Sequence, residues 1–392
     1  MSPLRINRRR FLGCSAAASL ALAQGNVVDA GVRPQTVRLG FVGLGNRGTA
    51  LLRTALELPG VEVVAVADLE EKHRIRAQGI AEKVSRHRPD GVETAARLLD
   101  RTDVDALIVA LPCDLHATTY RDAIRAGKHL YAEKPLGLTV AECDAVIADA
   151  ARAPSVVVHI GHQRRSNARY LAGVDLIRRG ELGEPIEARA SWISSNGPVR
   201  GHEGWLGRRE RSGDWMVEQA VHVWDVLHWI AGVVPDQAFG TGRRGLFSDV
   251  DPGRNVTDWY QVQLDWVSGF HASMTHSWID PADEAFTGVT LRHLGSEGGF
   301  DFGSGTATFR SKARSRETLH PGNLADTRDC LSAFAEAIRS QNPVSPPLSL
   351  VEAREAVVTG LLVRKAVDEG RLVRRDEILS GGISAPVPFG LT

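Results

Sequence analysis

The sequence lacks an excess of charge of either sign. Its 392 residues include 47 Lys and Arg and 47 Asp and Glu, which gives a formal net charge of zero at pH 7. Nucleic acids and anionic membrane surfaces attract proteins with a surplus of positive charge, so neither is expected as a partner. The sequence also lacks internal repeats and low-complexity tracts, and its length is sufficient for two domains with separate cores.

Cysteines and metal-ligand patterns are scarce. Beyond the N-terminal Cys14, the cysteines are Cys113, Cys143 and Cys330, which are odd in number and far apart. Because no C-x-x-C pair occurs, neither a disulfide framework nor a zinc site is expected. No carboxylate–histidine spacing demands another metal, and no G-x-S-x-G motif for a serine nucleophile is present.

Near the N-terminus, the apolar stretch is too short to span a bilayer. It covers residues 12–23, follows Arg8-Arg9-Arg10-Phe11-Leu12 and ends in Ala21-Leu22-Ala23, a small-residue pattern suited to cleavage. Consecutive arginines followed one residue later by Phe-Leu resemble a twin-arginine export signal. We therefore expect an export signal at 1–30, the twin-arginine machinery as a partner and a periplasmic or otherwise exported protein. A basic disordered tail is the alternative.

A glycine motif dominates the first part of the chain. An apolar run at 37–42 predicts a buried strand, Asn46 opens a helical pattern, and Gly43, Gly45 and Gly48 lie around that junction in the spacing G-x-G-x-x-G. In this spacing the glycines allow a tight turn, approach of a pyrophosphate and close packing of helix on strand. The helix N-terminus offers N–H groups to the anion. A turn without a ligand is the alternative.

An acidic residue, Asp68, ends the next predicted strand, 20 residues after Gly48. A carboxylate at this place hydrogen-bonds a ribose 2′-OH and repels a 2′-phosphate, although it could also cap the following helix. The combination predicts a dinucleotide site for NAD, with NADP less favoured.

Strand and helix patterns alternate as far as about residue 160. We expect strands at 37–42, 61–68, 106–111, 129–133 and 156–160, and helices after Asn46 and at 69–88, 92–99, 115–126 and 139–152. This succession predicts a doubly wound parallel sheet with right-handed crossovers. The NAD-binding Rossmann domain is therefore placed at 31–160.

Beyond residue 160, strands follow one another with few helices between them. A helix at 167–179 precedes alternating strands at 185–193, 260–266, 270–278, 289–293 and 307–309, and helices at 325–340 and 350–369 close the fold. Such runs indicate a mostly antiparallel sheet. The fold class is thus α/β, with a Rossmann domain followed at 161–392 by an α+β domain whose last helices return to the Rossmann domain.

A specific family signature lies at the end of the fourth of these parallel strands. Ala132-Glu133-Lys134-Pro135-Leu136, preceded by Pro112, His116 and Gly127-Lys128-His129, resembles the signature of the glucose–fructose oxidoreductase/inositol dehydrogenase (Gfo/Idh/MocA) family. The resemblance covers about residues 36–375. It implies a Rossmann domain joined to a C-terminal domain whose open sheet binds substrate and often builds dimers or tetramers, so a homo-oligomer is expected.

The resemblance also implies roles for residues of the Rossmann domain. Lys134 matches the lysine that contacts the reacting hydroxyl, and Glu133 matches the glutamate near the nicotinamide ribose. An ammonium group there could stabilise a developing alkoxide, and desolvation could lower its pKa toward the working pH; an ordinary strand-end ion pair of Glu133 is the alternative. The expected cofactor-binding residues are Gly43, Gly45, Asn46, Arg47, Gly48, Asp68, Pro112, His116, Glu133 and Lys134.

The family's second signature, Gly-Gly-x-x-x-Asp-x-Gly-x-His-x-x-Asp, is matched at residues 213–225. We expect this stretch to be a helix, and the spacing of Glu218, His222 and Asp225 then puts all three on one face. The resemblance makes His222 the general base and puts Glu218 in place of the assisting aspartate, while Ala220 replaces a usual glycine. A core histidine on an amphipathic helix is the alternative for His222.

Aromatic and basic residues supply candidate substrate contacts. All eight tryptophans lie between Trp192 and Trp278, and sugars are often bound by aromatic stacking; most of the tryptophans are nevertheless expected in the core, Trp224, Trp229 and Trp266 among them. Family members often place substrate contacts after the last Rossmann strand, where His162, Arg164 and Arg165 lie. The segment 208–211 could cover the pocket and favour an acidic sugar, or form a solvated loop. The expected substrate-binding residues are Arg164, Arg165, Asp225, Trp205 and Trp215.

These expectations converge on an exported, NAD-dependent oxidoreductase. It would transfer hydride between a secondary alcohol of a sugar, a sugar acid or an inositol and nicotinamide, with His222 taking the hydroxyl proton, Glu218 steadying it and Lys134 polarising the same oxygen. The alternative is an NAD-dependent glycoside hydrolase that oxidises its sugar transiently on a tightly bound cofactor, which would suit an exported protein. A sugar-binding protein without turnover is a third hypothesis.

Overall fold

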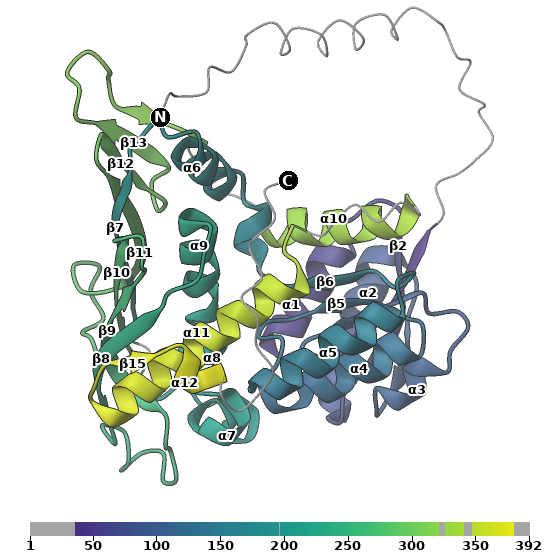
Figure 1. Cartoon of the computed structure of the whole chain (residues 1–392). Coiled ribbons are helices and arrows are strands. Elements are labelled where there is room, and N and C mark those ends of the chain that lie inside the picture. The colour runs from purple at the N-terminus through teal and green to yellow at the C-terminus, as the bar shows by residue number, and fades with distance from the viewer. Residues whose placement is uncertain (1–35, 196, 321–325, 341–346, 380–392) are drawn as a thin grey trace, which may run out of the picture. The chain divides into compact units, whose positions relative to one another are not determined.

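The computed structural model describes residues 36–195, 197–320, 326–340 and 347–379. The expected export signal at 1–30 lies outside these residues. Figure 1 shows a parallel-sheet domain and a second, larger sheet, with helices α9 and α11 between the two. In the described part of the chain, no helix is long and apolar enough to cross a membrane.

The first domain has the expected doubly wound parallel sheet. Six strands lie in the order β3-β2-β1-β4-β5-β6, all parallel. The strand order reverses between β1 and β4, which opens a crevice at their carboxyl ends where such sheets bind ligands. The strands are β1 (Val37–Val42), β2 (Val61–Ala67), β3 (Asp90–Val92), β4 (Ala106–Val109), β5 (His129–Ala132) and β6 (Val158–Ile160).

The helices of this domain agree with the sequence pattern except around residue 92. They are α1 (Asn46–Ala55), α2 (Glu71–Ser85), α3 (Ala96–Leu99), α4 (His116–Arg125) and α5 (Val140–Arg152). The helix expected at 92–99 begins only at Ala96, because Val92 belongs to β3, which pairs with the end of β2. A three-residue edge strand is too short to show a period of two, so the pattern did not indicate it.

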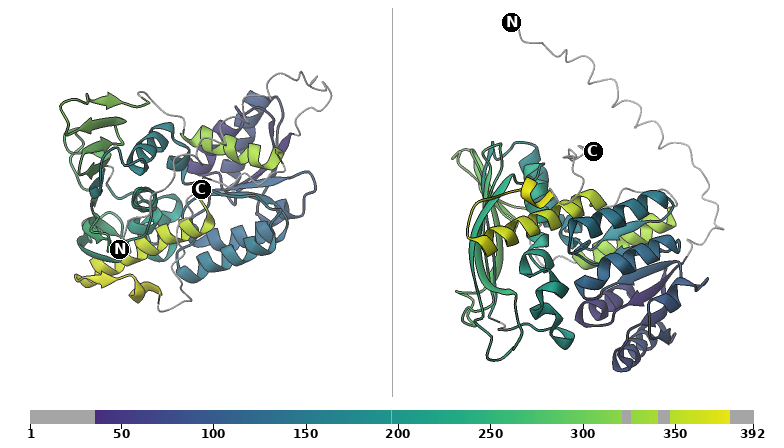
Figure 2. Two further views of the ribbon diagram at one scale, coloured as in Figure 1. Left: turned by 45° about the horizontal axis from the view of Figure 1, so that its top comes forward. Right: turned by 60° about the horizontal axis from the view of Figure 1, so that its bottom comes forward.

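The second domain is built on a nine-stranded sheet. Its order is β14-β13-β12-β11-β7-β10-β9-β8-β15, and only β7 and β10 pair in parallel. Figures 1 and 2 show helices α6, α9 and α11 on one face of this sheet and none over the other. The main strands are β7 (Pro185–Ile193), β8 (Gln237–Arg244), β9 (Thr257–Asp265), β10 (His271–Ser277), β11 (Gly288–Gly295), β12 (Gly298–Asp301) and β13 (Thr306–Phe309), with β14 (Glu317–Thr318) and β15 (Val373–Arg374) at the edges.

Strand β8 was not expected from the sequence, and its glycines explain why. Gly240 and Gly242 lower the strand propensity of this segment. A Cβ atom on either glycine would lie within 3 Å of Val367, a residue of α11 (Leu350–Glu369). The glycines therefore let the last long helix pack directly on the sheet.

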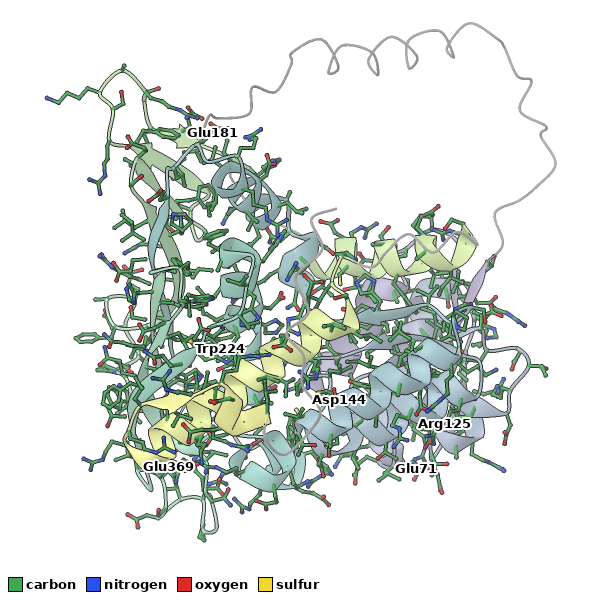
Figure 3. All side chains as sticks on the ribbon, in the orientation of Figure 1. Glu71, Arg125, Asp144, Glu181, Trp224 and Glu369 are labelled. Atoms are coloured by element: carbon green, nitrogen blue, oxygen red, sulfur yellow. The ribbon has the colours of Figure 1, made fainter. Side chains whose placement is uncertain are left out.

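The C-terminal helices return to the Rossmann domain, as expected. Helix α10 (Asp326–Arg339) packs against α1 and β1, and α11 packs against α5, α9 and β8. On α11, Arg354 forms an ion pair with Asp144 of α5, with an N–O distance of 2.6 Å. Figure 3 labels Asp144 on α5 and Glu369 at the far end of α11. Helix α11 therefore reaches from the first domain to the sheet of the second. The remaining helices of the domain are α6 (Ala168–Arg178), the short α7 (Arg209–Ser212) and α8 (Trp215–Glu218), α9 (Val221–Ala231) and α12 (Asp376–Leu379).

Buried histidines make the stability of the fold dependent on pH. Burial lowers the pKa of His159 and His293 to about 4 and that of His228 and His276 to about 3. Since each folded-state pKa lies below the unfolded value of about 6.5, the stabilisation is complete above that pH and is lost as the pH falls toward 4. We expect the free energy of unfolding to drop by at least about 2 kcal/mol between pH 7.5 and pH 5. Urea unfolding at pH 7.5 and at pH 5 measures this free energy. The control variant is His87→Gln, which replaces an exposed histidine and should show the same drop as the wild type.

Candidate active site

The glycine turn has the shape expected of a dinucleotide cradle. Gly43 has a positive φ of 84°, and a Cβ on Gly48 would lie 1.9 Å from the carbonyl oxygen of Gly43. At Gly45, by contrast, a Cβ would meet no atom within 4 Å, so the turn is open on that side. No side chain caps α1, whose first amide groups are free to bind an anion.

Asp68 lies beside this turn, at the carboxyl end of β2. One carboxylate oxygen accepts a hydrogen bond from the backbone N–H of Leu44 (2.7 Å), and the other accepts one from the N–H of Glu70 (2.9 Å). These bonds fix the carboxylate against the glycine turn and leave oxygen lone pairs for a ligand hydroxyl. The N-cap of α2 is Glu70, so Asp68 is not the helix cap that the sequence allowed.

Arg47 and Glu133 form an ion pair that joins α1 to the end of β5. The Arg47 Nε lies 2.6 Å from a Glu133 carboxylate oxygen, and the glutamate side chain is only 4% exposed. Burial alone would lower the pKa of Arg47, but the Glu133 carboxylate outweighs it and the net shift is upward. A Cβ on Gly161 would lie 3.1 Å from this carboxylate, so the glycine after β6 makes room for it.

Lys134 extends from the end of β5 toward the second domain. Its Nζ donates to the carboxylate and to the backbone carbonyl oxygen of Glu218, both at 2.6 Å. An ammonium group has three donors, so one remains for a ligand. Burial favours the neutral amine, but Glu218 and the other acidic groups outweigh it and the pKa of Lys134 is raised. The expected downward shift is therefore wrong, because Glu218 compensates the desolvation.

Glu218 and His222 do not belong to one regular helix. Helix α8 ends at Glu218 and α9 begins at Val221, so the single helix expected over residues 213–225 is wrong. The break frees the carbonyl of Glu218 for Lys134, and the Glu218 carboxylate bonds Lys134 rather than His222. The role expected for Glu218, steadying His222, is thus replaced by a role in holding Lys134.

His222 lies at the start of α9 and is 7% exposed. Its Nδ1 has no hydrogen-bond partner among the described residues, and its ring stacks on Trp192 of β7, with the centroids 6.4 Å apart. Burial lowers the pKa of His222 well below its ordinary value, and the positive charges of Lys134 and Arg164 lower it further. The imidazole is therefore neutral at pH 7 and can accept a proton.

Trp192 and Arg164 complete the surroundings of His222. The Arg164 guanidinium lies 5.4 Å from the centroid of the Trp192 ring and has no acidic partner within the described ranges. Sequence reasoning missed Trp192. The alternation that buries Ala188 and Ala190 puts Trp192 on the same, helix-covered face of β7, which is the signal that identifies it.

Two residues expected to contact substrate are paired with each other in the interior. Arg165 is 5% exposed, Asp225 is 1% exposed, and their side chains are 2.7 Å apart. His162 lies behind Asp225 at 3.5 Å, and Glu352 of α11 lies 3.4 Å from Arg165. This network ties the segment after β6 to α9 and α11, next to His222. The expectation of direct substrate contact by Arg165 and Asp225 is corrected to a positioning role, because neither is accessible.

Three further expectations are corrected by burial or pairing. Trp215 is 2% exposed and packs 4.9 Å from Trp278, so it cannot form a pocket wall. His116 is 1% exposed, and its two ring nitrogens lie 2.9 and 2.8 Å from the carbonyl oxygens of Leu111 and Pro135, so the ring is enclosed between two loops. In the segment 208–211, every arginine is paired with a carboxylate, which leaves none free for an acidic sugar. The tryptophans expected in the core, Trp224, Trp229 and Trp266, are confirmed there.

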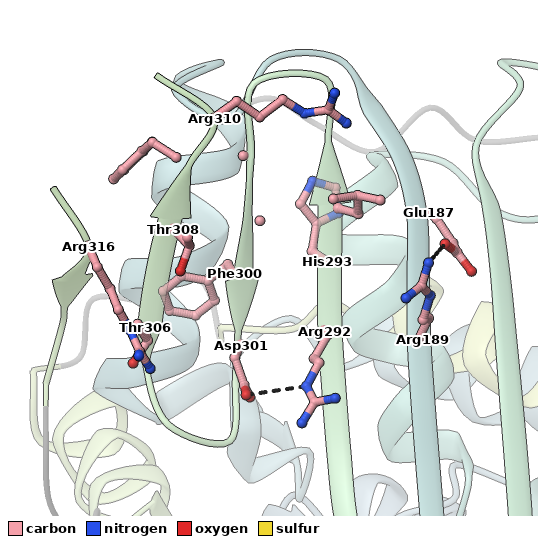
Figure 4. Close-up of a pocket in the computed structure, with 14 residues that line it drawn as sticks. Glu187, Arg189, Arg292, His293, Phe300, Asp301, Thr306, Thr308, Arg310 and Arg316 are labelled. Carbon is pink, nitrogen blue, oxygen red and sulfur yellow. Dashed lines mark hydrogen bonds and ion pairs between the residues drawn. The ribbon is translucent and has the colours of Figure 1, made fainter. Parts of the chain in front are cut away.

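A separate hollow of about 540 Å³ lies on the second sheet, over β7, β11, β12 and β13. Figure 4 shows its charged side chains, in which Arg189 pairs with Glu187 and Arg292 with Asp301. Neither Lys134 nor His222 lines it. Among the described residues, no cluster of three or more His, Cys, Asp or Glu could hold a metal ion.

Comparison with known proteins identifies both domains. Residues 37–162 match the oxidoreductase family with an NAD-binding Rossmann fold (GFO_IDH_MocA), and residues 170–301 match the GFO/IDH/MocA C-terminal domain. A 1,5-anhydro-D-fructose reductase of Ensifer adhaerens is 28% identical over 342 residues, which cover 85% of this chain and 97% of the relative. A glycosyl hydrolase family 109 protein of Shewanella sp. (strain W3-18-1) is 29% identical over 215 residues, 48% of this chain and 46% of the relative.

A solved structure confirms the fold. The scyllo-inositol dehydrogenase of Lactobacillus casei, determined with NAD(H) and scyllo-inositol bound, superposes with a TM-score of 0.71 at 17% identity. The superposition covers 87% of this chain and 100% of the dehydrogenase.

Proposed function

Because the chain belongs to the Gfo/Idh/MocA oxidoreductase family, we propose that it is an NAD-dependent enzyme that transfers hydride between a secondary alcohol and nicotinamide. The alcohol belongs to a sugar, a sugar acid or an inositol. The observation that supports this most concerns two neighbouring side chains. Among the described residues, two hydrogen bonds occupy the Lys134 ammonium, which leaves its third donor for a ligand, and the neutral His222 has no partner for its Nδ1 atom.

The proposed mechanism divides the proton and the hydride between two acceptors. When bound, the nicotinamide accepts the hydride from the carbinol carbon as the hydroxyl becomes a carbonyl. His222 accepts the hydroxyl proton, since it is neutral at pH 7. Lys134 is charged because its pKa is raised, so it donates a hydrogen bond to the oxygen and stabilises its negative charge rather than removing a proton. Glu218 holds that ammonium in place.

The test is a rate assay with a panel of substrates. Purified protein receives NAD and neutral sugars, sugar acids or inositols, and the reduced-nicotinamide absorbance is followed. We expect at least one class to be oxidised; no oxidation of any class, together with no reduction of the matching ketones, would contradict the proposal.

The family 109 relatives favour glycoside hydrolysis as a second candidate, but they match only 48% of the chain. Release of nitrophenol from nitrophenyl glycosides without added NAD would support that candidate.

We propose NAD rather than NADP as the cofactor, on the basis of the Asp68 carboxylate beside the glycine turn. Asp68→Asn keeps an acceptor for the Leu44 N–H but removes the negative charge that repels a 2′-phosphate. We expect the ratio of kcat/KM for NAD to that for NADP to fall about 10-fold, which is about 1.4 kcal/mol. Asp103→Asn, a surface change at the opposite end of β4, is the matched control. An unchanged ratio in the Asp68 variant would remove this basis for cofactor choice.

Export and assembly are part of the same proposal. The arginine pattern near the N-terminus supports twin-arginine export to the periplasm, a compartment in which a tightly bound NAD(H) would be an advantage. Cell fractionation of the Arg8→Lys/Arg9→Lys variant tests the export.

The face of the nine-stranded sheet that carries no helix among the described residues supports a homodimer or homotetramer. Light scattering of the purified protein measures its oligomeric state.

A further inference from the structure

One segment of the second domain contacts the loops around the dinucleotide crevice of the first domain. This segment, here called the outer wall, comprises residues 202–212: a 3-10 helix (His202–Gly207) and α7 (Arg209–Ser212). His202 lies 3.6 Å from Glu70, and its ring centroid is 6.0 Å from that of His73. At the other end, Arg211 lies 3.3 Å from Asp114, and α7 packs on the turn Cys113–Leu115.

These contacts fall on both sides of the glycine turn. Glu70 and His73 follow strand β2, and Asp114 follows strand β4, while β1 lies between those two strands. The glycine turn follows β1. A segment that touches the loops after both β2 and β4 therefore spans the crevice beside that turn, where a Cβ on Gly45 would meet no atom within 4 Å.

The outer wall is fixed firmly at its root and weakly at its contacts with the first domain. Inside the second domain, Arg209 forms an ion pair at 2.7 Å with Asp214, whose side chain is fully buried, and a second at 2.8 Å with the partly exposed Asp368. The contacts of Arg211 and His202 with the first domain are partly exposed, with side-chain exposures of 30% and 50%. Partly exposed pairs are weak, so this side can open while the root stays in place.

We propose that the outer wall closes the dinucleotide site and sets the rate at which the cofactor leaves it. The inference rests on the proposed function, because it requires a dinucleotide on the glycine turn. A dinucleotide bound there can leave only after the Arg211–Asp114 and His202–Glu70 contacts have separated. This arrangement favours slow exchange of the cofactor, as a closed redox cycle would need.

The test is the dissociation rate of NADH, followed by its fluorescence in a stopped-flow chase. Arg211→Gln and Asp114→Asn should each speed dissociation about 2- to 5-fold, and the double variant should be no faster than the faster single variant, because both remove the same pair. Arg314→Gln, which breaks an arginine–carboxylate pair with Glu181 at the far end of the second sheet, should change nothing. Bound NADH should also slow hydrogen exchange of the amides of residues 202–212.

The outcomes separate this inference from the function on which it rests. If NADH binds but its release is the same in all variants and residues 202–212 gain no protection, the outer wall does not close the site. If the wild-type protein binds no NADH at all, the proposed function fails and the inference fails with it.

Discussion

Replacing Lys134 with alanine is expected to lower kcat/KM for polyol oxidation by at least about 100-fold while the protein still binds NADH. The loss is this large because the proposed mechanism assigns the remaining donor of the ammonium to charge that develops only in the transition state. Binding of NADH depends mainly on the glycine turn and Asp68, so its Kd should change less than about threefold. Initial rates and fluorescence titration measure the two quantities.

A matched control separates this effect from loss of structure. Lys128 also donates to two backbone carbonyl oxygens, at 2.6 and 2.9 Å, but it does so at the opposite end of the parallel sheet. Lys128→Ala should therefore lower the melting temperature without a specific loss of turnover. The kcat/KM of Glu218→Gln should lie between those of Lys134→Ala and Lys128→Ala, because this variant keeps the Lys134 ammonium but holds it less firmly. Full activity in Lys134→Ala would overturn the role given to this lysine.

Replacing His222 with asparagine is expected to lower kcat by about 10²- to 10⁴-fold, the usual contribution of a general base. The pH profile of the wild type provides a second readout. Because the pKa of His222 is well below its ordinary value, the base stays neutral as the pH falls, and the initial rate of oxidation should not halve near pH 6.5. A half-loss near pH 6.5 would contradict the buried, positively surrounded imidazole described above.

His228 supplies the control for His222 because it is a second histidine on the same helix and is less exposed than His222. It is 1% exposed, and its Nε2 lies 3.0 Å from the Thr359 hydroxyl. His228→Gln should cost stability but leave the kcat of the folded protein near that of the wild type. Equal losses of kcat in the two variants would mean that His222 acts only through packing.

The elements with local signals were predictable from the sequence. The glycine turn follows from G-x-G-x-x-G, and α11 begins where Ser349 and Glu352 form a reciprocal cap, so both were placed correctly. Lys134 could be identified because a specific motif surrounds it at a strand end.

The arrangement inside the site could not be predicted because it depends on contacts between distant segments. Glu218 lies 84 residues after Lys134, and their pairing accompanies the break between α8 and α9. Asp225 similarly finds Arg165 across 60 residues, which turns two expected substrate contacts into an interior pair. The helical spacing of residues 213–225 does not indicate that Lys134, from the other domain, will donate a hydrogen bond to the backbone carbonyl of Glu218.

In the proposed reaction, hydride passes between a carbinol carbon and nicotinamide at Lys134 and His222. The most direct measurement uses the polyol identified by the panel assay, deuterated at the carbinol carbon, and mass spectrometry of the dinucleotide after one turnover. We predict that the wild type transfers the deuterium to nicotinamide and that Lys134→Ala and His222→Asn transfer little in the same time. Turnover by the wild type with no deuterium in the nicotinamide, or equal transfer by all three proteins, would contradict it.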